Sequence, residues 1–254
     1  MGREKTAEKG KSYHAPALEK GLDILELLSG ATRPMGLSEI SQEVGRSKSE
    51  IFRMLHVLER RHYLERAPGT DHYLLTNHLF LLGMERPPLK GLLEVALPMM
   101  HELSDATEQS CHLVVPSEES MVVIARIDPP GDLGLVVRIG HRRPILAATS
   151  GLVLTAFQLP DVRKRWIADY GDALPAKERK SIEARLDAIA VDGFAAINSA
   201  VVPGVTDISA PVMQSGMAIA ALTIPFMNRV GVPMSQPQAA AMAREKAEAI
   251  AQRI

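Results

Sequence analysis

The run "SKSEIFRMLHVLER", residues 47–60, carries a stripe of hydroxyl, cationic and imidazole side chains. On a helix with about 100° between residues, apolar side chains gather on one side and the opposite side carries Ser49, Arg53, His56 and Arg60. Arginine binds phosphate oxygens and guanine edges, and the N–H groups at a helix start also bind phosphate. The stripe therefore indicates either a nucleic-acid contact or a solvated helix face.

The elements expected around the stripe must position it. Leucines at helical spacing over residues 18–28 predict a first helix. Ser38 is expected as the N-cap of a helix of about two turns that ends before Gly45. Ser47 and Glu50 form the capping-box pattern that starts the next helix. Two short helices are therefore expected on either side of a tight turn.

A hairpin is expected after these helices, with strands at residues 63–66 and 72–75 and a Pro68-Gly69 turn between them. Three helices followed by a hairpin follow the plan of a winged helix-turn-helix, whose second paired helix enters the major groove. Because every surrounding element falls where that plan needs it, DNA contact is favoured over a solvated face.

Charge supports this interpretation locally. The formal net charge is −1, so the charge of the whole chain does not indicate a polyanionic partner. Residues 46–66 nevertheless hold six basic side chains against the acidic Glu50, Glu59 and Glu65. The expected DNA-contacting residues are Ser38, Arg46, Ser47, Lys48, Ser49, Phe52, Arg53 and Arg60.

Phe52 lies nearer the polar stripe than the apolar side of this helix. Two roles fit it: packing against the wing, or contact with a thymine methyl group in the major groove. The packing role is the favoured one.

The rest of the 254 residues is long enough for a second core. Apolar residues at helical spacing over residues 89–103 predict a connecting helix. Strands are expected at residues 112–115, 121–127, 135–139, 194–198, 206–212 and 217–225, and helices at residues 150–158, 161–170, 176–190 and 236–253. The predicted fold is a two-domain α+β protein.

Three motifs in order resemble the IclR family of bacterial transcriptional regulators: "GLSEISQEVGRSKSEIFRMLHVLERRHYLER", "VRIGHRRPILAATSGLVLTAF" and "PGVTDISAPV". The resemblance implies an N-terminal winged helix-turn-helix, a linker helix, and a C-terminal GAF/profilin-like effector-binding domain with a curved antiparallel sheet. The expected divisions are a disordered arm at 1–13, the DNA-binding domain at 14–76, the linker region at 77–103 and the effector-binding domain at 104–254.

The same resemblance implies a homodimer or tetramer that binds double-stranded operator DNA and a small-molecule effector, an organic acid or an aromatic metabolite. Family dimers commonly use the first helix and the linker helix, although packing within one chain explains the apolar stripe of residues 89–103 equally well. The effector pocket is expected to be lined by Leu135, Thr149, Ser150, Val205, Asp207, Ser209 and Thr223.

Asp207 needs a partner inside a pocket, because a bare buried carboxylate is costly. The partner is either an effector group or a protein cation such as Arg126 or Arg138, and a protein partner is favoured. His112, His141 and Cys111 are expected as packing or surface residues, because no ligand spacing connects them. We expect no metal and no cofactor.

Other function classes have less support. "AATSG" is not the Gly-x-Ser-x-Gly elbow of serine hydrolases. The sequence also has no Gly-rich phosphate loop and no second metal-binding histidine after His101-Glu102, so we do not expect an enzyme. A helix-turn-helix that serves only as a protein-interaction scaffold remains possible. The single cysteine, the charged first residues and the absence of an 18-residue apolar run predict a cytoplasmic protein that does not enter a membrane.

Overall fold

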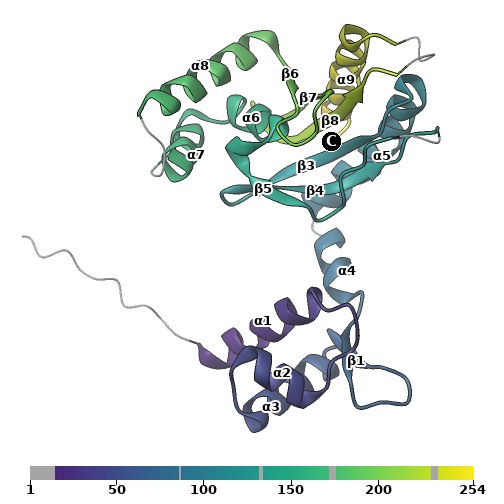
Figure 1. Ribbon diagram of the computed structural model, residues 1–254, viewed down its shortest axis with the longest axis vertical. Coiled ribbons are helices and arrows are strands. Elements are labelled where there is room, and N and C mark those ends of the chain that lie inside the picture. The colour runs from purple at the N-terminus through teal and green to yellow at the C-terminus, as the bar shows by residue number, and fades with distance from the viewer. Residues whose placement is uncertain (1–14, 86, 132–133, 172–175, 230–233) are drawn as a thin grey trace, which may run out of the picture. The chain divides into compact units, whose positions relative to one another are not determined.

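The computed structural model describes residues 15–85, 87–131, 134–171, 176–229 and 234–254, so the arm predicted at residues 1–13 lies outside the described residues. The chain divides into two compact units, Met1–Arg86 and Pro87–Ile254 (Figure 1). The linker region predicted at residues 77–103 holds two helices, one in each unit.

The N-terminal unit begins with three helices, α1 (Pro16–Ser29), α2 (Leu37–Val44) and α3 (Lys48–Arg60). Their apolar sides meet in one core. Its fully or nearly fully buried members are Ile24, Leu28, Ile40, Ile51, Leu55, Leu64 and Tyr73. On α2 and α3 the helical periodicity of the sequence predicted the buried side, whereas on α1 the predicted stripe includes Leu18 and Leu22, which are 64% and 48% exposed.

The turn between α2 and α3 is fixed by backbone and side-chain hydrogen bonds. Gly45 has a φ of 67°, in the left-handed region that favours glycine, and its N–H donates to the Gln42 carbonyl at 3.2 Å. Ser41 Oγ donates to the Arg46 carbonyl at 2.6 Å, while the Arg46 N–H donates to the Ser41 carbonyl at 3.1 Å. The start of α3 is thereby held at a set angle to α2.

The two helix starts differ from each other in how well they were predicted. Ser47 caps α3 as expected, accepting from the Glu50 N–H at 3.4 Å, while the Glu50 carboxylate accepts from the Ser47 N–H at 3.3 Å. At α2 the N-cap is Gly36, and the prediction of Ser38 was wrong. The Glu39 carboxylate accepts from the Gly36 N–H at 2.9 Å, which starts the helix two residues earlier and leaves Ser38 inside its first turn.

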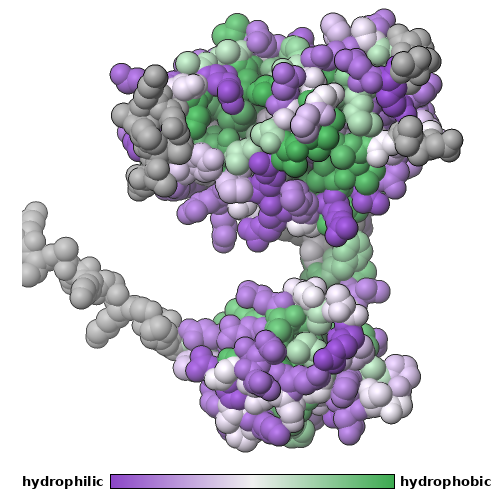
Figure 2. All heavy atoms as spheres, in the orientation of Figure 1, coloured by the Kyte–Doolittle hydropathy of each residue, from purple (hydrophilic) through white to green (hydrophobic). Residues whose placement is uncertain are grey.

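The wing consists of β1 (Leu64–Arg66) and β2 (Tyr73–Leu75), paired antiparallel with Leu64 opposite Leu75. A further bridge joins Met35 to Tyr73 and ties the wing to the segment before α2. After the wing comes α4 (His78–Glu85), whose residues 79–82 are all exposed and apolar. Figure 2 shows hydrophobic residues gathered on this helix.

The C-terminal unit contains one six-stranded antiparallel sheet with the order β5-β4-β3-β8-β7-β6. Its strands are β3 (Cys111–Ser117), β4 (Ser120–Ile127), β5 (Arg142–Pro144), β6 (Ala195–Asn198), β7 (Val205–Gln214) and β8 (Met217–Met227). Pairing of β3 with β8 joins the early and late halves of the unit. Residues far apart in sequence are thus placed side by side on the sheet.

Helices cover both faces of this sheet. Helices α5 (Pro87–Thr107) and α9 (Gln236–Ala251) pack together against strands β3, β4, β7 and β8. The short helix η1 (Ile145–Ala147) and α6 (Thr149–Ala156) lie on the other face, with α7 (Pro160–Gly171) and α8 (Ala176–Asp192) beyond them (Figure 1). The fully buried α6 leaves its first turn at the edge of the cavity described below.

Two predictions about this unit need correction or resolution. Residues 135–139 form no strand: β5 pairs with residues 120–122 of β4, and the described bonding along this edge continues to Gly140 and His141, through Val123, and ends there. The apolar stripe of residues 89–103 is covered within the chain, where Ala96, Met100 and Leu103 are fully buried. The intrachain explanation of that stripe is therefore the right one.

Candidate functional site

The first candidate site is the outward side of α3 together with the turn before it. All eight residues expected to contact DNA are exposed, with Ser38 on α2, Arg46 and Ser47 in the turn, and Lys48, Ser49, Phe52, Arg53 and Arg60 on α3. No described carboxylate lies within 4 Å of the cationic groups of Arg46, Lys48, Arg53 or Arg60. Four cations on this surface are thus available to an anionic partner.

The acidic residues of α3 are engaged elsewhere. Glu50 accepts a hydrogen bond from Lys20 on α1 and another from Ser47 Oγ at 2.8 Å, and these bonds lower its pKa to about 2. Glu59 accepts from Arg66 Nε at 3.0 Å. Because both carboxylates are paired with cations of neighbouring elements, the outward side of α3 keeps a positive charge.

The wing is held against α3 by Arg66. Besides Glu59, its guanidinium donates to Asp71 at 3.1 Å and to the Tyr73 hydroxyl at 3.1 Å. This network fixes the hairpin beside the helix. Because the Arg66 guanidinium is bonded to Glu59, Asp71 and Tyr73, it is not free to bind an anionic partner. Phe52, an exposed residue of α3, lines a hollow with Ser38 of α2 and His72 of the wing.

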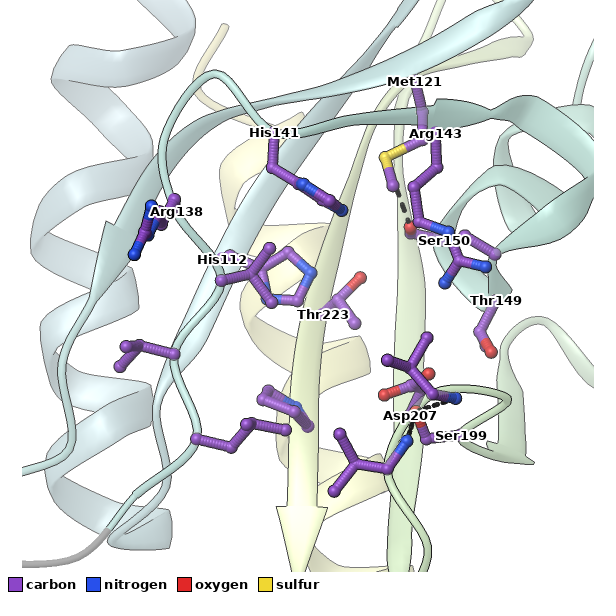
Figure 3. Close-up of a pocket in the computed structure, with 17 residues that line it drawn as sticks. His112, Met121, Arg138, His141, Arg143, Thr149, Ser150, Ser199, Asp207 and Thr223 are labelled. Carbon is purple, nitrogen blue, oxygen red and sulfur yellow. Dashed lines mark hydrogen bonds between the residues drawn. The ribbon is translucent and has the colours of Figure 1, made fainter. Parts of the chain in front are cut away.

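The second candidate site is a cavity of about 300 Å³ in the C-terminal unit (Figure 3). Of the seven residues expected to line it, it contains Leu135, Thr149, Ser150, Asp207 and Thr223. The other members of its lining are His112, Met121, Val136, Val137, Arg138, His141, Ala148, Arg143, Ser199, Val201, Val202 and Pro225. Its volume is at the lower end for small-molecule sites.

Sheet register builds the floor of the cavity. His112 on β3 lies opposite Thr223 on β8, and Asp207 on β7 lies opposite Pro225 on β8. Val205 and Ser209 share the strand face of Asp207 by alternation, yet neither lines the cavity. Val205 is buried opposite Met227 at the strand end, and Ser209 is fully buried, with its Oγ 2.8 Å from Thr223 Oγ1. These two predicted residues therefore flank Asp207 on its strand face without lining the cavity.

The walls come from two loops and a helix start. Residues 135–138 and 141 approach from one side and residues 199–202 from the other, while Thr149 and Ser150 begin α6. Ser110 Oγ, just before β3, donates to the Leu135 carbonyl and anchors the first loop there. Ser199 Oγ accepts from the Val201 N–H at 3.4 Å and orders the second.

Asp207 is the acidic group of the cavity. Burial raises the pKa of its carboxyl, while hydrogen bonding to Ser199, the charge of Arg143 and hydrogen bonding to Thr149 act in the opposite direction. The cation that faces Asp207 is Arg143; Arg126, considered from the sequence, pairs instead with Asp128 at 3.0 Å. Figure 3 shows the Arg143 guanidinium between Ser150 and Asp207.

His112 and Cys111 are buried neighbours with different surroundings. Burial, together with the charge of His141, lowers the pKa of His112 to about 4, so the imidazole is neutral near pH 7. Cys111 Sγ donates to the Met100 carbonyl at 3.3 Å, and burial raises the pKa of the thiol to about 12. Among the described residues, no three His, Cys, Asp or Glu side chains are grouped so as to hold a metal ion.

Sequence reasoning missed His112 and Arg143 as pocket residues. The alternation of β3 places His112 on the face of Val114, which packs beneath α6, and this signal could have indicated His112. Arg143 lies opposite Met121 in the β4–β5 pairing, and nothing in the sequence sets that register. The position of Arg143 was therefore hidden from the sequence, which had offered Arg138, another lining residue, as a partner of Asp207.

Comparison with known proteins now gives the family. The family model described as bacterial transcriptional regulator IclR C-terminal matches residues 90–252, and that of the IclR helix-turn-helix domain matches residues 17–68. The chain belongs to the IclR family. It is a DNA-binding transcriptional regulator whose operator binding is modulated by a small-molecule effector in the C-terminal domain.

Known relatives of this IclR-family regulator cover most of its length. It is 33% identical to the HTH-type transcriptional regulator KdgR of Escherichia coli strain K12 over 213 residues, which are 82% of this chain and 80% of that protein. It is 27% identical to the glycerol operon regulatory protein of Streptomyces coelicolor over 199 residues, 77% of this chain and 78% of the relative.

Solved structures agree with its fold. An IclR homolog from Microbacterium hydrocarbonoxydans, crystallised with 4-hydroxybenzoate, superposes with a TM-score of 0.78 at 21% identity, covering 93% of this chain and 98% of the other. Pseudomonas aeruginosa HmgR gives a TM-score of 0.75 at 25% identity, covering 94% and 99%. The α+β architecture expected from the resemblance is thereby confirmed. In the described part of the regulator, no helix has the length and apolar character needed to cross a membrane.

Proposed function

We propose that this regulator contacts its operator through the outward side of α3, and that its effector is a small organic acid held in the cavity beside Arg143. The four exposed cations of the first site, which no described carboxylate neutralises, are the observation that carries the DNA contact. Arg53 is the central member, because it lies on the first half of α3, and the N-terminal residues of a recognition helix reach base edges.

The chemistry of the cavity supports a carboxylate. Arg143 supplies a cation, and the hydroxyls of Thr149 and Ser150 lie beside it at the start of α6. Met121, Leu135 and Val137 supply apolar wall for a short chain or a single ring. A structural neighbour was crystallised with 4-hydroxybenzoate, an acid of this size class.

The regulator is proposed to act in the cytoplasm as a homodimer or tetramer. An effector that binds one arrangement of the dimer more tightly shifts the separation of the two α3 helices relative to half-sites about 34 Å apart. The cavity is proposed to bind its ligand without converting it, so the C-terminal unit serves as a sensor and not as an enzyme.

The test is a gel-shift titration of an operator fragment with the full chain. We expect Arg53→Ala to lose specific retention while its circular dichroism stays that of the wild type. His101→Ala, an exposed change on α5, is the matched control and keeps full binding. Undiminished binding by Arg53→Ala would remove this residue from the contact surface.

The same titration is repeated with 4-hydroxybenzoate and with short aliphatic hydroxy acids. An effector changes the apparent Kd for the operator and, by mass action, raises the Tm of the free protein. Arg143→Leu should lose both responses, whereas Arg126→Leu, outside the cavity, keeps them. If carboxylates act equally on wild type and Arg143→Leu, the proposed cationic contact is wrong.

A further inference from the structure

Phe52 is an aromatic side chain that the N-terminal unit exposes without a structural need. It is 50% exposed, whereas its neighbours Ile51 and Leu55 on the same helix are completely buried. Met54 and Leu58 pack against the core from α3, and Phe52 is not among the described side chains that do so. The core of the unit is thus complete without this ring.

The Phe52 ring lies beside the cationic, outward side of α3. On α3, Phe52 lies about 40° from His56 and about 60° from Ser49, one turn after Lys48. The hollow that it lines continues to Ser38 at the start of α2 and to His72 of the wing. Lys48, Ser49 and Arg53 on the first half of α3 can bind phosphate near the ring. The carboxylates of Glu39 and Asp71, which line the hollow with it, are each paired with an arginine.

The chemistry of the major groove offers one partner for such a surface. Base edges there present hydrogen-bond donors and acceptors, and the apolar exception is the C5-methyl group of thymine. An aromatic ring cannot bind phosphate, but it gains free energy when it covers a methyl group and both leave water.

We propose that Phe52 contacts the C5-methyl group of a thymine in each operator half-site and so makes thymine the preferred base at that position. This inference rests on the proposed function, because it requires α3 to lie in the major groove. It assigns to a residue of this chain a base preference that the cations alone, which bind phosphate or guanine, do not supply.

The experiment removes the methyl group and nothing else. An operator is selected from a random duplex library with the full chain, and each thymine of its half-site is then replaced singly by deoxyuridine. We expect one such replacement to weaken binding by the wild type about three- to fivefold, the effect of one methyl group covered by an apolar surface. Phe52→Ala should bind the thymine and deoxyuridine operators equally.

Two further variants make the result specific. Val57→Ala removes another exposed apolar side chain of α3, 39% exposed, and should keep the full discrimination. Phe52→Leu retains an apolar surface and should keep part of the discrimination between thymine and deoxyuridine. This variant replaces Phe52→Ala in the test if circular dichroism shows that Phe52→Ala does not fold. A partial effect in Phe52→Leu supports the contact, and full discrimination in Phe52→Ala contradicts it.

The outcomes separate this inference from the function on which it rests. If the operator is bound in an Arg53-dependent manner but no deoxyuridine replacement weakens binding, the thymine contact is wrong and the DNA-contacting role of α3 stands. If no operator is selected and binding does not depend on Arg53, both are wrong. Equal losses in the wild type and Phe52→Ala also refute the contact, because the methyl group then acts through another residue.

Discussion

His112 is a buried imidazole whose protonation opposes folding. Its folded pKa is about 4 because of burial and the neighbouring charge of His141, while an unfolded histidine has a pKa near 6.5. Between these values the unfolded chain binds the proton and the folded protein does not. The free energy of unfolding therefore falls as pH drops below about 6.5, and the loss is complete below about 4.

We expect His112→Gln to remove this part of the pH dependence, which is on the order of 3 kcal/mol. Urea unfolding followed by tryptophan fluorescence at pH 7 and pH 4.5 measures it, because Trp166, the single tryptophan, is buried in the C-terminal unit. Asp207 titrates in both proteins, so the difference between them isolates His112. An equal pH dependence in the variant would show that His112 is not buried as a neutral group.

Among the site residues, those set by local pattern could be predicted and those set by pairing could not. The side of α3 that carries Arg53 follows from helical periodicity, and the shared face of Val205, Asp207 and Ser209 on β7 follows from strand alternation. The cation that faces Asp207 is Arg143, and the β4–β5 register brings it to the cavity. Register between strands distant in sequence leaves no short-range signal.

At the scale of elements, α6 is fixed by the close approach of Gly151 to the segment before it. A Cβ atom at Gly151 would lie 1.7 Å from the Ile145 carbonyl oxygen, so any side chain there forces α6 away from η1. Because Thr149 and Ser150 occupy the first turn of α6, the cavity would change with it.

We expect Gly151→Ala to lower the free energy of unfolding by about 3 kcal/mol or more and to abolish the effector response. Gly91→Ala, in α5 where an added Cβ meets nothing within 4 Å, should leave stability unchanged or raise it by up to about 1 kcal/mol. Urea unfolding of the two variants side by side checks this. Equal stability of the pair would contradict the close packing of α6.

Most elements were predictable, and the exceptions have physical causes. The glycine at position 45 marked the end of α2 correctly, and the capping box at Ser47 marked the start of α3. Residues 135–139 have strand composition but form no ladder, because the segment leaves the edge of β4 at Gly140, whose φ is 81°, and residues 135–138 line the cavity instead. Helix α4 was missed as a separate element, since its consecutive apolar residues have no helical periodicity.

At the scale of the whole molecule, the exposed apolar residues of α4 fit the homodimer or tetramer proposed above. Leu79, Phe80, Leu81 and Leu82 point to all sides of α4 and are all exposed within the chain. Leu18 and Leu22 on α1, 64% and 48% exposed, add to the uncovered apolar surface of the same unit. Apolar surface on this scale commonly marks a protein–protein interface.

We expect Phe80→Glu to shift the protein toward a smaller species in light scattering, because a carboxylate would have to be buried without a partner in the dimer. Operator binding should weaken with it, since two linked half-sites are no longer engaged together. Val191→Glu, at an 86% exposed position on α8, is the control and should leave the assembly unchanged. An unaltered mass for Phe80→Glu would place the interface elsewhere.

The burial of Cys111 has a practical consequence for measuring how an effector changes the separation of the two α3 helices in the proposed dimer. It is the only cysteine in the chain, and with a pKa of about 12 its thiol forms almost no thiolate, the species that reacts with maleimides. Cys111 will therefore not react with a maleimide label, and it need not be replaced before site-directed labelling. One cysteine introduced on the exposed side of α3 would carry a fluorophore or spin label in each subunit, and the distance between the two labels would report how an effector moves them.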